Sequence, residues 1–206
     1  MKKNFSILAT AALALGMFSS IASATPINNG SGLASPAATI TFNEIALANN
    51  TVMSNQYASL GISSVSGLFY NGCENNCVTT PPSGTHPELS NFSNTNTGAY
   101  TSLSDIIFGA DQSAVAFEFA SNGGLFTLTA LLAGNIVESF QFQGGAWGIY
   151  GFTGTTLDEI RIQSPSAFLL DNLQLSNTST VPEPGSLALL GLGLFGLGAL
   201  RRRKTA

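Results

Sequence analysis

The chain has 206 residues, of which 44% are hydrophobic and only 9% charged, so Ser, Thr, Asn and Gln must supply most of its solubility. This composition excludes a charge-rich disordered chain. Between Thr25 and Thr180, Arg161 is the one basic residue that accompanies ten acidic ones, which leaves this stretch with a net charge of -9. Nucleic acid is excluded as a partner, because phosphate binding needs clustered basic side chains.

The first 24 residues predict a secretory signal peptide. Two lysines precede an apolar run from Ile7 to Phe18, and small residues follow at Ala22 and Ala24. We expect signal peptidase to cleave after Ala24, so that the mature chain begins at Thr25. An uncleaved membrane anchor is the alternative, although the apolar run is short for a stable span.

Residues 25–180 predict one β domain without a second core. Apolar residues alternate with polar or small ones at Ile40 and Phe42, and again at Val115, Phe117 and Phe119, which is the period of a β-strand. We expect strands over residues 39–43, 62–70, 106–108, 114–119, 125–132, 136–142, 147–152, 157–162 and 168–175.

The one soluble helix that we expect is short, over residues 55–60, with Ser54 as its N-cap and Gly61 as its C-terminal stop. Turn sequences at Asn122-Gly123-Gly124 and Ala133-Gly134-Asn135 predict an antiparallel meander with two tight hairpins over residues 114–142. About nine strands without crossover helices indicate a single antiparallel β-sandwich of jelly-roll type.

A second targeting segment follows the β domain, over residues 181–204. The prolines of Val181-Pro182-Glu183-Pro184 favour an extended backbone, which suits a processing enzyme. The apolar stretch 185–200 rises roughly 24 Å as a helix, against about 30 Å of hydrocarbon, so we expect a transmembrane helix that only just spans. The basic cluster, Arg201, Arg202, Arg203 and Lys204, stays in the cytoplasm by the positive-inside rule and puts residues 25–180 across the membrane.

These three parts, in this order over residues 181–204, closely resemble the PEP-CTERM sorting signal of Gram-negative bacteria. The resemblance implies an anchor in the inner membrane with a periplasmic body, removal of the tail by an exosortase, and transfer to the cell surface or the exopolysaccharide matrix. An ordinary transmembrane anchor that is never processed is the alternative, because hydropathy alone predicts the same insertion.

The body is similar to the β-sandwich ectodomains that are common among PEP-CTERM proteins. The matching pieces are short and spread along the chain: Thr41-Phe42-Asn43-Glu44, Gln56-Tyr57, Leu60-Gly61 and Leu170-Asp171-Asn172-Leu173. They imply a fold more than an activity.

Cys73 and Cys77 are the only cysteines, and export brings them into an oxidising compartment. We expect a local disulfide between them that stiffens an Asn-rich loop. The alternative is a zinc site, for which the nearby Glu74 and His86 do not supply standard ligand spacing.

A calcium site is a second metal hypothesis for the body. If the first and last strands pair, Glu44 and Asp171 converge, and two carboxylates with loop oxygens suit Ca²⁺. In the alternative, which the lack of a dense Asp-x-Asp loop favours, Glu44 caps a turn and Asp171 accepts hydrogen bonds from backbone amides.

Trp147 and Tyr150, followed by Phe152 in a glycine-rich run, are candidates for stacking on sugar rings. The alternative is that these aromatic side chains pack in the core.

Catalysis has no visible site. His86 is the single histidine and lies in a Pro-rich loop, and the neighbours Asp158 and Glu159 point to opposite faces of a strand. We therefore expect a non-enzymatic surface or matrix protein without a cofactor. A carbohydrate-binding module, with calcium as a candidate stabilising ion, is the second reading, and an extracellular hydrolase is the third.

Overall fold

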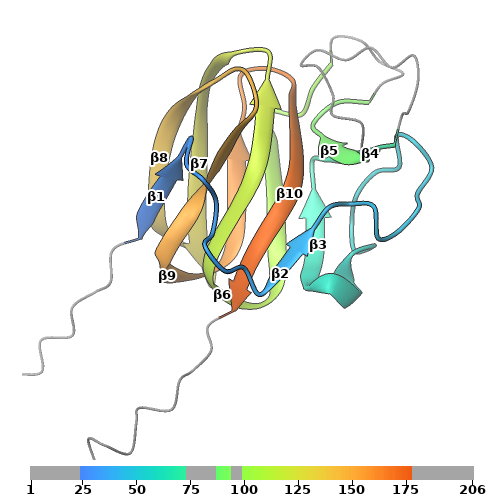
Figure 1. The fold of residues 1–206 in the computed structure, drawn as a ribbon. Coiled ribbons are helices and arrows are strands. Elements are labelled where there is room, and N and C mark those ends of the chain that lie inside the picture. The colour runs from blue at the N-terminus through green and yellow to red at the C-terminus, as the bar shows by residue number, and fades with distance from the viewer. Residues whose placement is uncertain (1–23, 73–86, 94–98, 178–206) are drawn as a thin grey trace, which may run out of the picture.

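The structure, a computed structural model, describes residues 24–72, 87–93 and 99–177. Within these ranges the chain forms ten strands and a short 3-10 helix, Ala58–Leu60 (Figure 1). The strands are β1 (Thr25–Asn28), β2 (Ala38–Ile40), β3 (Ile62–Ser66), β4 (Phe69–Asn71), β5 (Glu88–Ser90), β6 (Leu103–Ser121), β7 (Gly124–Leu132), β8 (Asn135–Gly144), β9 (Gly148–Gln163) and β10 (Phe168–Asn177). The prediction of an all-β chain is confirmed.

The two longest strands, β6 and β9, form an antiparallel ladder that bends over on itself. Residues 103–107 pair with 159–163, and residues 112–119 pair with 148–157, with register shifts between the two stretches. The first stretch has β3 on one side and β7 with β8 on the other. The second stretch lies between β1 and β10. One continuous sheet is therefore folded into two layers, which we call the β8 layer and the β10 layer.

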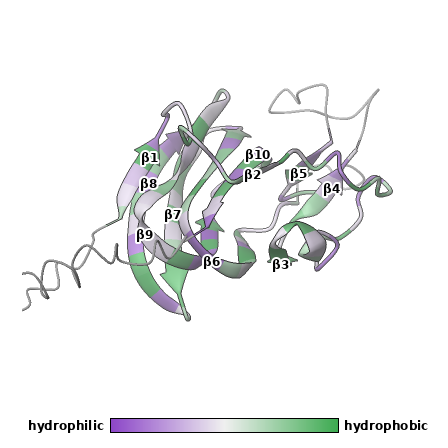
Figure 2. Cartoon of the chain, turned by 60° about the horizontal axis from the view of Figure 1, so that its bottom comes forward, coloured by the Kyte–Doolittle hydropathy of each residue, from purple (hydrophilic) through white to green (hydrophobic). Residues whose placement is uncertain are grey.

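Aromatic side chains join the two layers. Phe119, on the β10 layer, meets Phe126 of β7 and Phe142 of β8 edge to face, with ring centroids 5.0 and 5.2 Å apart. It also stacks on Phe168 of β10. All four rings are at most 3% exposed. Hydrophobic and hydrophilic residues alternate along the strands that carry them (Figure 2). This face-to-face packing is that of the predicted antiparallel β-sandwich.

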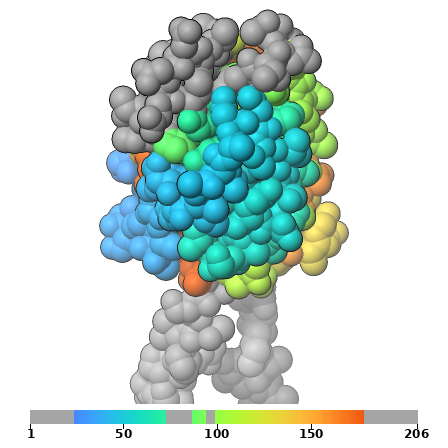
Figure 3. Space-filling model, turned by 90° about the vertical axis from the view of Figure 1, so that its right-hand side faces the viewer, coloured from blue at the N-terminus to red at the C-terminus, as the bar shows by residue number. Residues whose placement is uncertain are grey.

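The segment from β2 to β5 closes one side of the sandwich. Its apolar side chains join the same core, and Figure 3 shows residues of about 40–70 covering this side. Phe42 and Tyr57 are its centre, with ring centroids 5.3 Å apart, and the Tyr57 hydroxyl donates to the Phe42 carbonyl at 2.7 Å. Burial raises the pKa of Tyr57 far above its ordinary value of 10.0.

The predicted meander over residues 114–142 is half right. The turn at Ala133-Gly134 joins β7 and β8 as a tight antiparallel hairpin. The expected hairpin at Asn122-Gly123-Gly124 is wrong, because β9 lies between β6 and β7. Here the chain crosses from the β10 layer to the β8 layer, and the apolar faces of β6 and β7 bury each other across the sandwich.

Several predicted elements have different bounds. Instead of a strand over 39–43, β2 ends at Ile40, since Phe42 has a φ of 58°. The strand over 62–70 is split at Gly67 into β3 and β4, and the strands over 106–108 and 114–119 are one strand, as are those over 147–152 and 157–162. The helix over 55–60 is only the 3-10 turn Ala58–Leu60. Gly61 ends it in the left-handed region, as predicted, but Ser54 does not cap it.

The strand β1 begins and β10 ends at the same end of the sandwich, the bottom in Figure 1. Thr25 pairs with Thr153, and Asn177 pairs with Gln112, close to the bends of β9 and β6. We call this end the base. The connections from β6 to β7, from β8 to β9 and from β9 to β10 lie at the opposite end, which we call the loop end.

Candidate functional site

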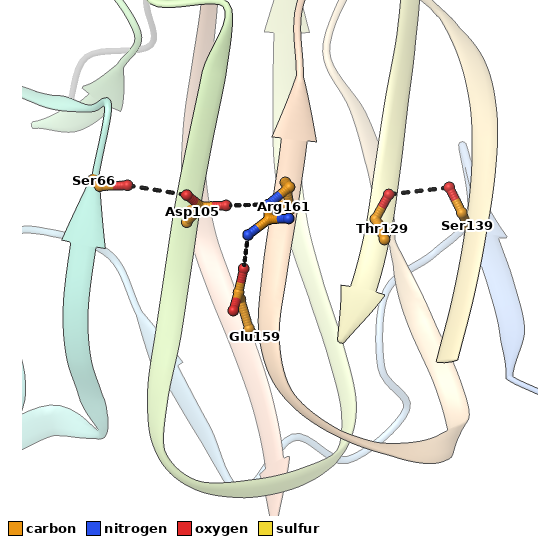
Figure 4. Close-up of polar contacts among 6 residues, drawn as sticks. All are labelled: Ser66, Asp105, Thr129, Ser139, Glu159 and Arg161. Atoms are coloured by element: carbon orange, nitrogen blue, oxygen red, sulfur yellow. Dashed lines mark hydrogen bonds and ion pairs between the residues drawn. The ribbon is translucent and has the colours of Figure 1, made fainter. Parts of the chain in front are cut away.

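The outer face of the β8 layer carries a row of polar contacts across five strands (Figure 4). Asp105 of β6, Arg161 of β9 and Thr129 of β7 are direct cross-strand partners. Arg161 Nε donates to Asp105 Oδ1 at 2.6 Å, and Ser66 Oγ of β3 donates to Asp105 Oδ2 at 3.2 Å. The hydroxyls of Thr129 and Ser139 of β8 are hydrogen-bonded at 3.0 Å. Alternation along each strand places all of these side chains on one face.

Arg161, the one basic residue between Thr25 and Thr180, binds two carboxylates. Its Nη2 donates to Glu159 Oε1 at 2.8 Å, and its side chain is 39% exposed, against 12% for Glu159 and 20% for Asp105. The hydrogen bond that Arg161 donates to Asp105 raises the pKa of Arg161. Burial raises the pKa of Glu159 and outweighs the opposing effect of the Arg161 charge. The two carboxylates hold the guanidinium in a fixed orientation on this face.

Of the two residues predicted to bind calcium, Asp171 lies on β10, while Glu44 follows the end of β2 by four residues. The strands themselves do pair, with Ile40 of β2 opposite Leu173 of β10. Glu44 Oε1 accepts from the backbone N–H of Thr41 at 2.8 Å, and so caps a turn. Asp171 is 6% exposed, and its Oδ1 accepts from the backbone N–H of Asn172 at 2.7 Å. Both contacts are those expected if the two carboxylates bind backbone amides and no metal. Calcium binding stays a prediction.

No group of three or more His, Cys, Asp or Glu side chains is placed to hold a metal ion within the three described ranges. One carboxylate pair lies on the β10 layer. There Glu118 and Asp171 are direct cross-strand partners, and Asn172 Nδ2 donates to Glu118 Oε2 at 2.9 Å.

The proposed sugar platform is wrong at Tyr150. This side chain is 6% exposed and stacks on Phe142, with ring centroids 4.1 Å apart. Phe152 is fully buried against Phe140. Both aromatic side chains therefore belong to the core. Trp147 lies in the turn between β8 and β9 and is partly buried, and a sugar contact there stays a prediction.

Two buried polar centres were not predicted from the sequence. Asn91, which is fully buried, accepts from the backbone N–H of Phe168 at 2.8 Å and donates to the carbonyls of Thr101 and Ser166. Glu88 is 1% exposed and accepts from Asn71 Nδ2 at 3.0 Å. Both centres border a polar stretch rich in Asn, Ser, Thr and Pro, whose composition indicates exposed turns and hides these buried partners.

Most of the predicted processing and disulfide residues lie outside the described residues. These are Ala22 of the signal cleavage site, Cys73 and Cys77, Glu74 and His86, Val181-Pro182-Glu183-Pro184, the apolar segment 185–200 and the basic cluster Arg201 to Lys204. Ala24 is described, is 6% exposed and directly precedes β1. In the part of the chain that the structure describes, no helix is both long and apolar enough to cross a membrane.

Comparison with known protein families identifies the C-terminal targeting segment. Residues 180–204 match the family model of the PEP-CTERM protein-sorting motif, which confirms the sorting signal predicted over residues 181–204. No curated protein matches the chain. The motif implies an exported protein with a C-terminal membrane-anchor signal that is processed by an exosortase.

Proposed function

We propose that the mature protein is a non-enzymatic component of the cell surface or of the exopolysaccharide matrix of a Gram-negative bacterium. Signal peptidase removes residues 1–24, the tail holds the β-sandwich at the periplasmic side of the inner membrane, and an exosortase then releases it. The observation that carries this proposal is the sorting motif at residues 180–204, which follows the last described strand after two residues.

Four carboxylates of β6, β8 and β9 make structural contacts, which supports a non-enzymatic role. Asp105 and Glu159 share Arg161, while Asp158 Oδ2 accepts from the backbone N–H of Ala133 at 2.9 Å. Glu138 Oε1 accepts from the backbone N–H of Ser139 in the same way. These groups hold turns and strands together. A hydrolase needs instead an acid and a base that face a common cleft.

Carbohydrate binding is the second candidate, and the outer face of the β8 layer favours it. Gln163, Thr127 and Gln141 are cross-strand partners in a second polar row beside the one that contains Arg161. Amide, hydroxyl and guanidinium groups at regular strand spacing can donate and accept hydrogen bonds with sugar hydroxyls. In this reading the face binds the matrix polysaccharide directly.

Fractionation of the producing cells tests the main proposal. The wild-type protein is expected in the extracellular matrix, and a variant with Pro182 and Pro184 both replaced by alanine is expected to stay in the inner membrane. Equal amounts of the two proteins in the matrix would contradict sorting through this motif.

Co-precipitation with the producer's exopolysaccharide separates the two candidates. If the face binds sugar, the double variant Gln141→Ala, Gln163→Ala loses binding, while Asn28→Ala, an exposed change on β1, keeps it. Repeating the assay with Ca²⁺ and with a chelator tests the calcium prediction. If the wild-type protein does not bind the polysaccharide, the carbohydrate-binding candidate is refuted and only the role of a passive matrix component remains.

A further inference from the structure

At the base of the sandwich, a row of paired residues leads from the end of β10 to the β7–β8 turn. Asn177, where β10 ends, pairs with Gln112, and Gln112 pairs with Leu157. The next residue, Asp158, accepts a hydrogen bond from Ala133 in the β7–β8 turn. At about 4.8 Å for each step between strands, the turn lies roughly 15 Å from the point where the tail begins. The turn and the tail therefore share one end of the molecule.

The length of the tail restricts how far this end can be from the membrane. Gly185, the first residue of the apolar segment, follows Asn177 by eight residues, which span at most about 29 Å when fully extended. Headgroups take up roughly 5–8 Å of this length. This leaves at most about 21–24 Å between Asn177 and the lipid surface, so the base stays near the bilayer whenever the tail is inserted.

The base also carries apolar side chains that are suited to this position. Ile136 lies next to the turn and is 69% exposed, the largest value among the exposed large hydrophobic residues that the structure describes. Val137, the next residue, is 37% exposed. The acidic side chains near this end are Asp111, Asp158 and Glu138, and the one lysine or arginine of the described residues, Arg161, is bound to Asp105 and Glu159. A surface of this kind is repelled by anionic headgroups and fits a zwitterionic lipid surface.

We propose that the base rests on the lipid surface while the tail is anchored, with Ile136 and Val137 in contact with the headgroup region. The loop end then faces away from the membrane, and an exosortase would cut the tail in the gap between the base and the lipid surface. A membrane-embedded enzyme reaches this gap more easily than a soluble protease does. The inference depends on the proposed function only in that the tail must be inserted.

The single tryptophan of the chain makes the test direct. Two exposed side chains of one hairpin lie at opposite ends of the sandwich: Ile136 at the base, and Leu125, 56% exposed, at the loop end. In a Trp147→Phe background, Ile136→Trp and Leu125→Trp each report one end. The two full-length proteins are reconstituted into phosphatidylcholine vesicles, with and without bromine on the lipid chains, and indole fluorescence is measured.

Brominated lipid is expected to quench the Ile136→Trp protein at least about twofold more strongly than the Leu125→Trp protein, because an indole at the interface lies close to the acyl chains. Adding phosphatidylglycerol is expected to reduce the difference. Equal quenching of the two proteins, while both float with the vesicles, overturns the inference and leaves the anchor intact. Proteins that do not float refute the anchoring itself, and with it the proposed function.

Discussion

Replacing Phe119 tests the packing that makes two layers out of one sheet. The side chain is 1% exposed and meets Phe126, Phe142, Tyr150 and Phe168 from both layers. Phe119→Ala removes these contacts and leaves a cavity between layers that the neighbouring strands cannot close. Core changes of this kind cost about 3–5 kcal/mol, and we expect about 4 kcal/mol here.

Phe140 provides the matched control. It lies on the edge strand β8, is partly buried, and contacts Phe142 and Phe152. Phe140→Ala should therefore cost about 1–2 kcal/mol, since only part of its surface leaves water on folding. Urea unfolding of the detergent-solubilised full chain, followed by circular dichroism, measures both free energies.

A double-mutant cycle measures the interaction energy between Phe119 and Phe126 directly. Phe119→Leu and Phe126→Leu should be coupled by about 0.5–1.5 kcal/mol, as expected for an edge-to-face aromatic pair. The packing is refuted if Phe119→Ala costs no more than Phe140→Ala and the cycle shows no coupling.

Changes at three further positions test polar contacts. Tyr57→Phe leaves the buried Phe42 carbonyl without its donor and should cost about 1–2 kcal/mol in urea unfolding; an unchanged midpoint would contradict this bond. Asn91→Ala should cost about 2–4 kcal/mol, and Asn91→Asp should be worse than Asn91→Ala at pH 7 but recover near pH 4, when the buried carboxyl is protonated. Because the folded state raises the pKa of Glu159, its contribution to stability is complete below its ordinary value of 4.5 and is lost as the pH rises through the higher folded value. The stability of Glu159→Gln relative to wild type should thus increase between pH 4 and pH 7, and a flat difference in thermal melts would argue against the shift.

The sequence predicted those features that depend on local pattern. Alternation found most strands, as at Val115, Phe117 and Phe119, because a strand with one buried face repeats every two residues. The sorting signal was also readable, since its parts act by composition and order and need no folded partner.

Features that depend on distant partners could not be read in this way. The turn at Asn122-Gly123 has hairpin chemistry, yet the strand that pairs with β6 comes more than twenty residues later, and only the completed sandwich selects it. Very short strands such as β1 and β5 lack a full period of alternation.

The candidate site shows the same division. Tyr150 and Phe152 lie in a glycine-rich run that suits a ligand, but β9 turns both rings inward against β8. Asn91 is polar and lies beside a polar loop, so nothing in the sequence indicates that it is buried with the carbonyls of Thr101 and Ser166. Arg161 could be singled out as the lone cation, whereas its two carboxylate partners required the cross-strand register.

Intact-mass analysis of the protein from its native envelope tests the central claim, that the chain is exported and processed at both ends. The account predicts a chain that begins at Thr25 and has lost the apolar segment 185–200 together with the basic cluster. A protein that begins at Thr25 but keeps Arg201 to Lys204 would make the tail an ordinary anchor. A protein that retains both its leader and its basic terminus would contradict the account entirely.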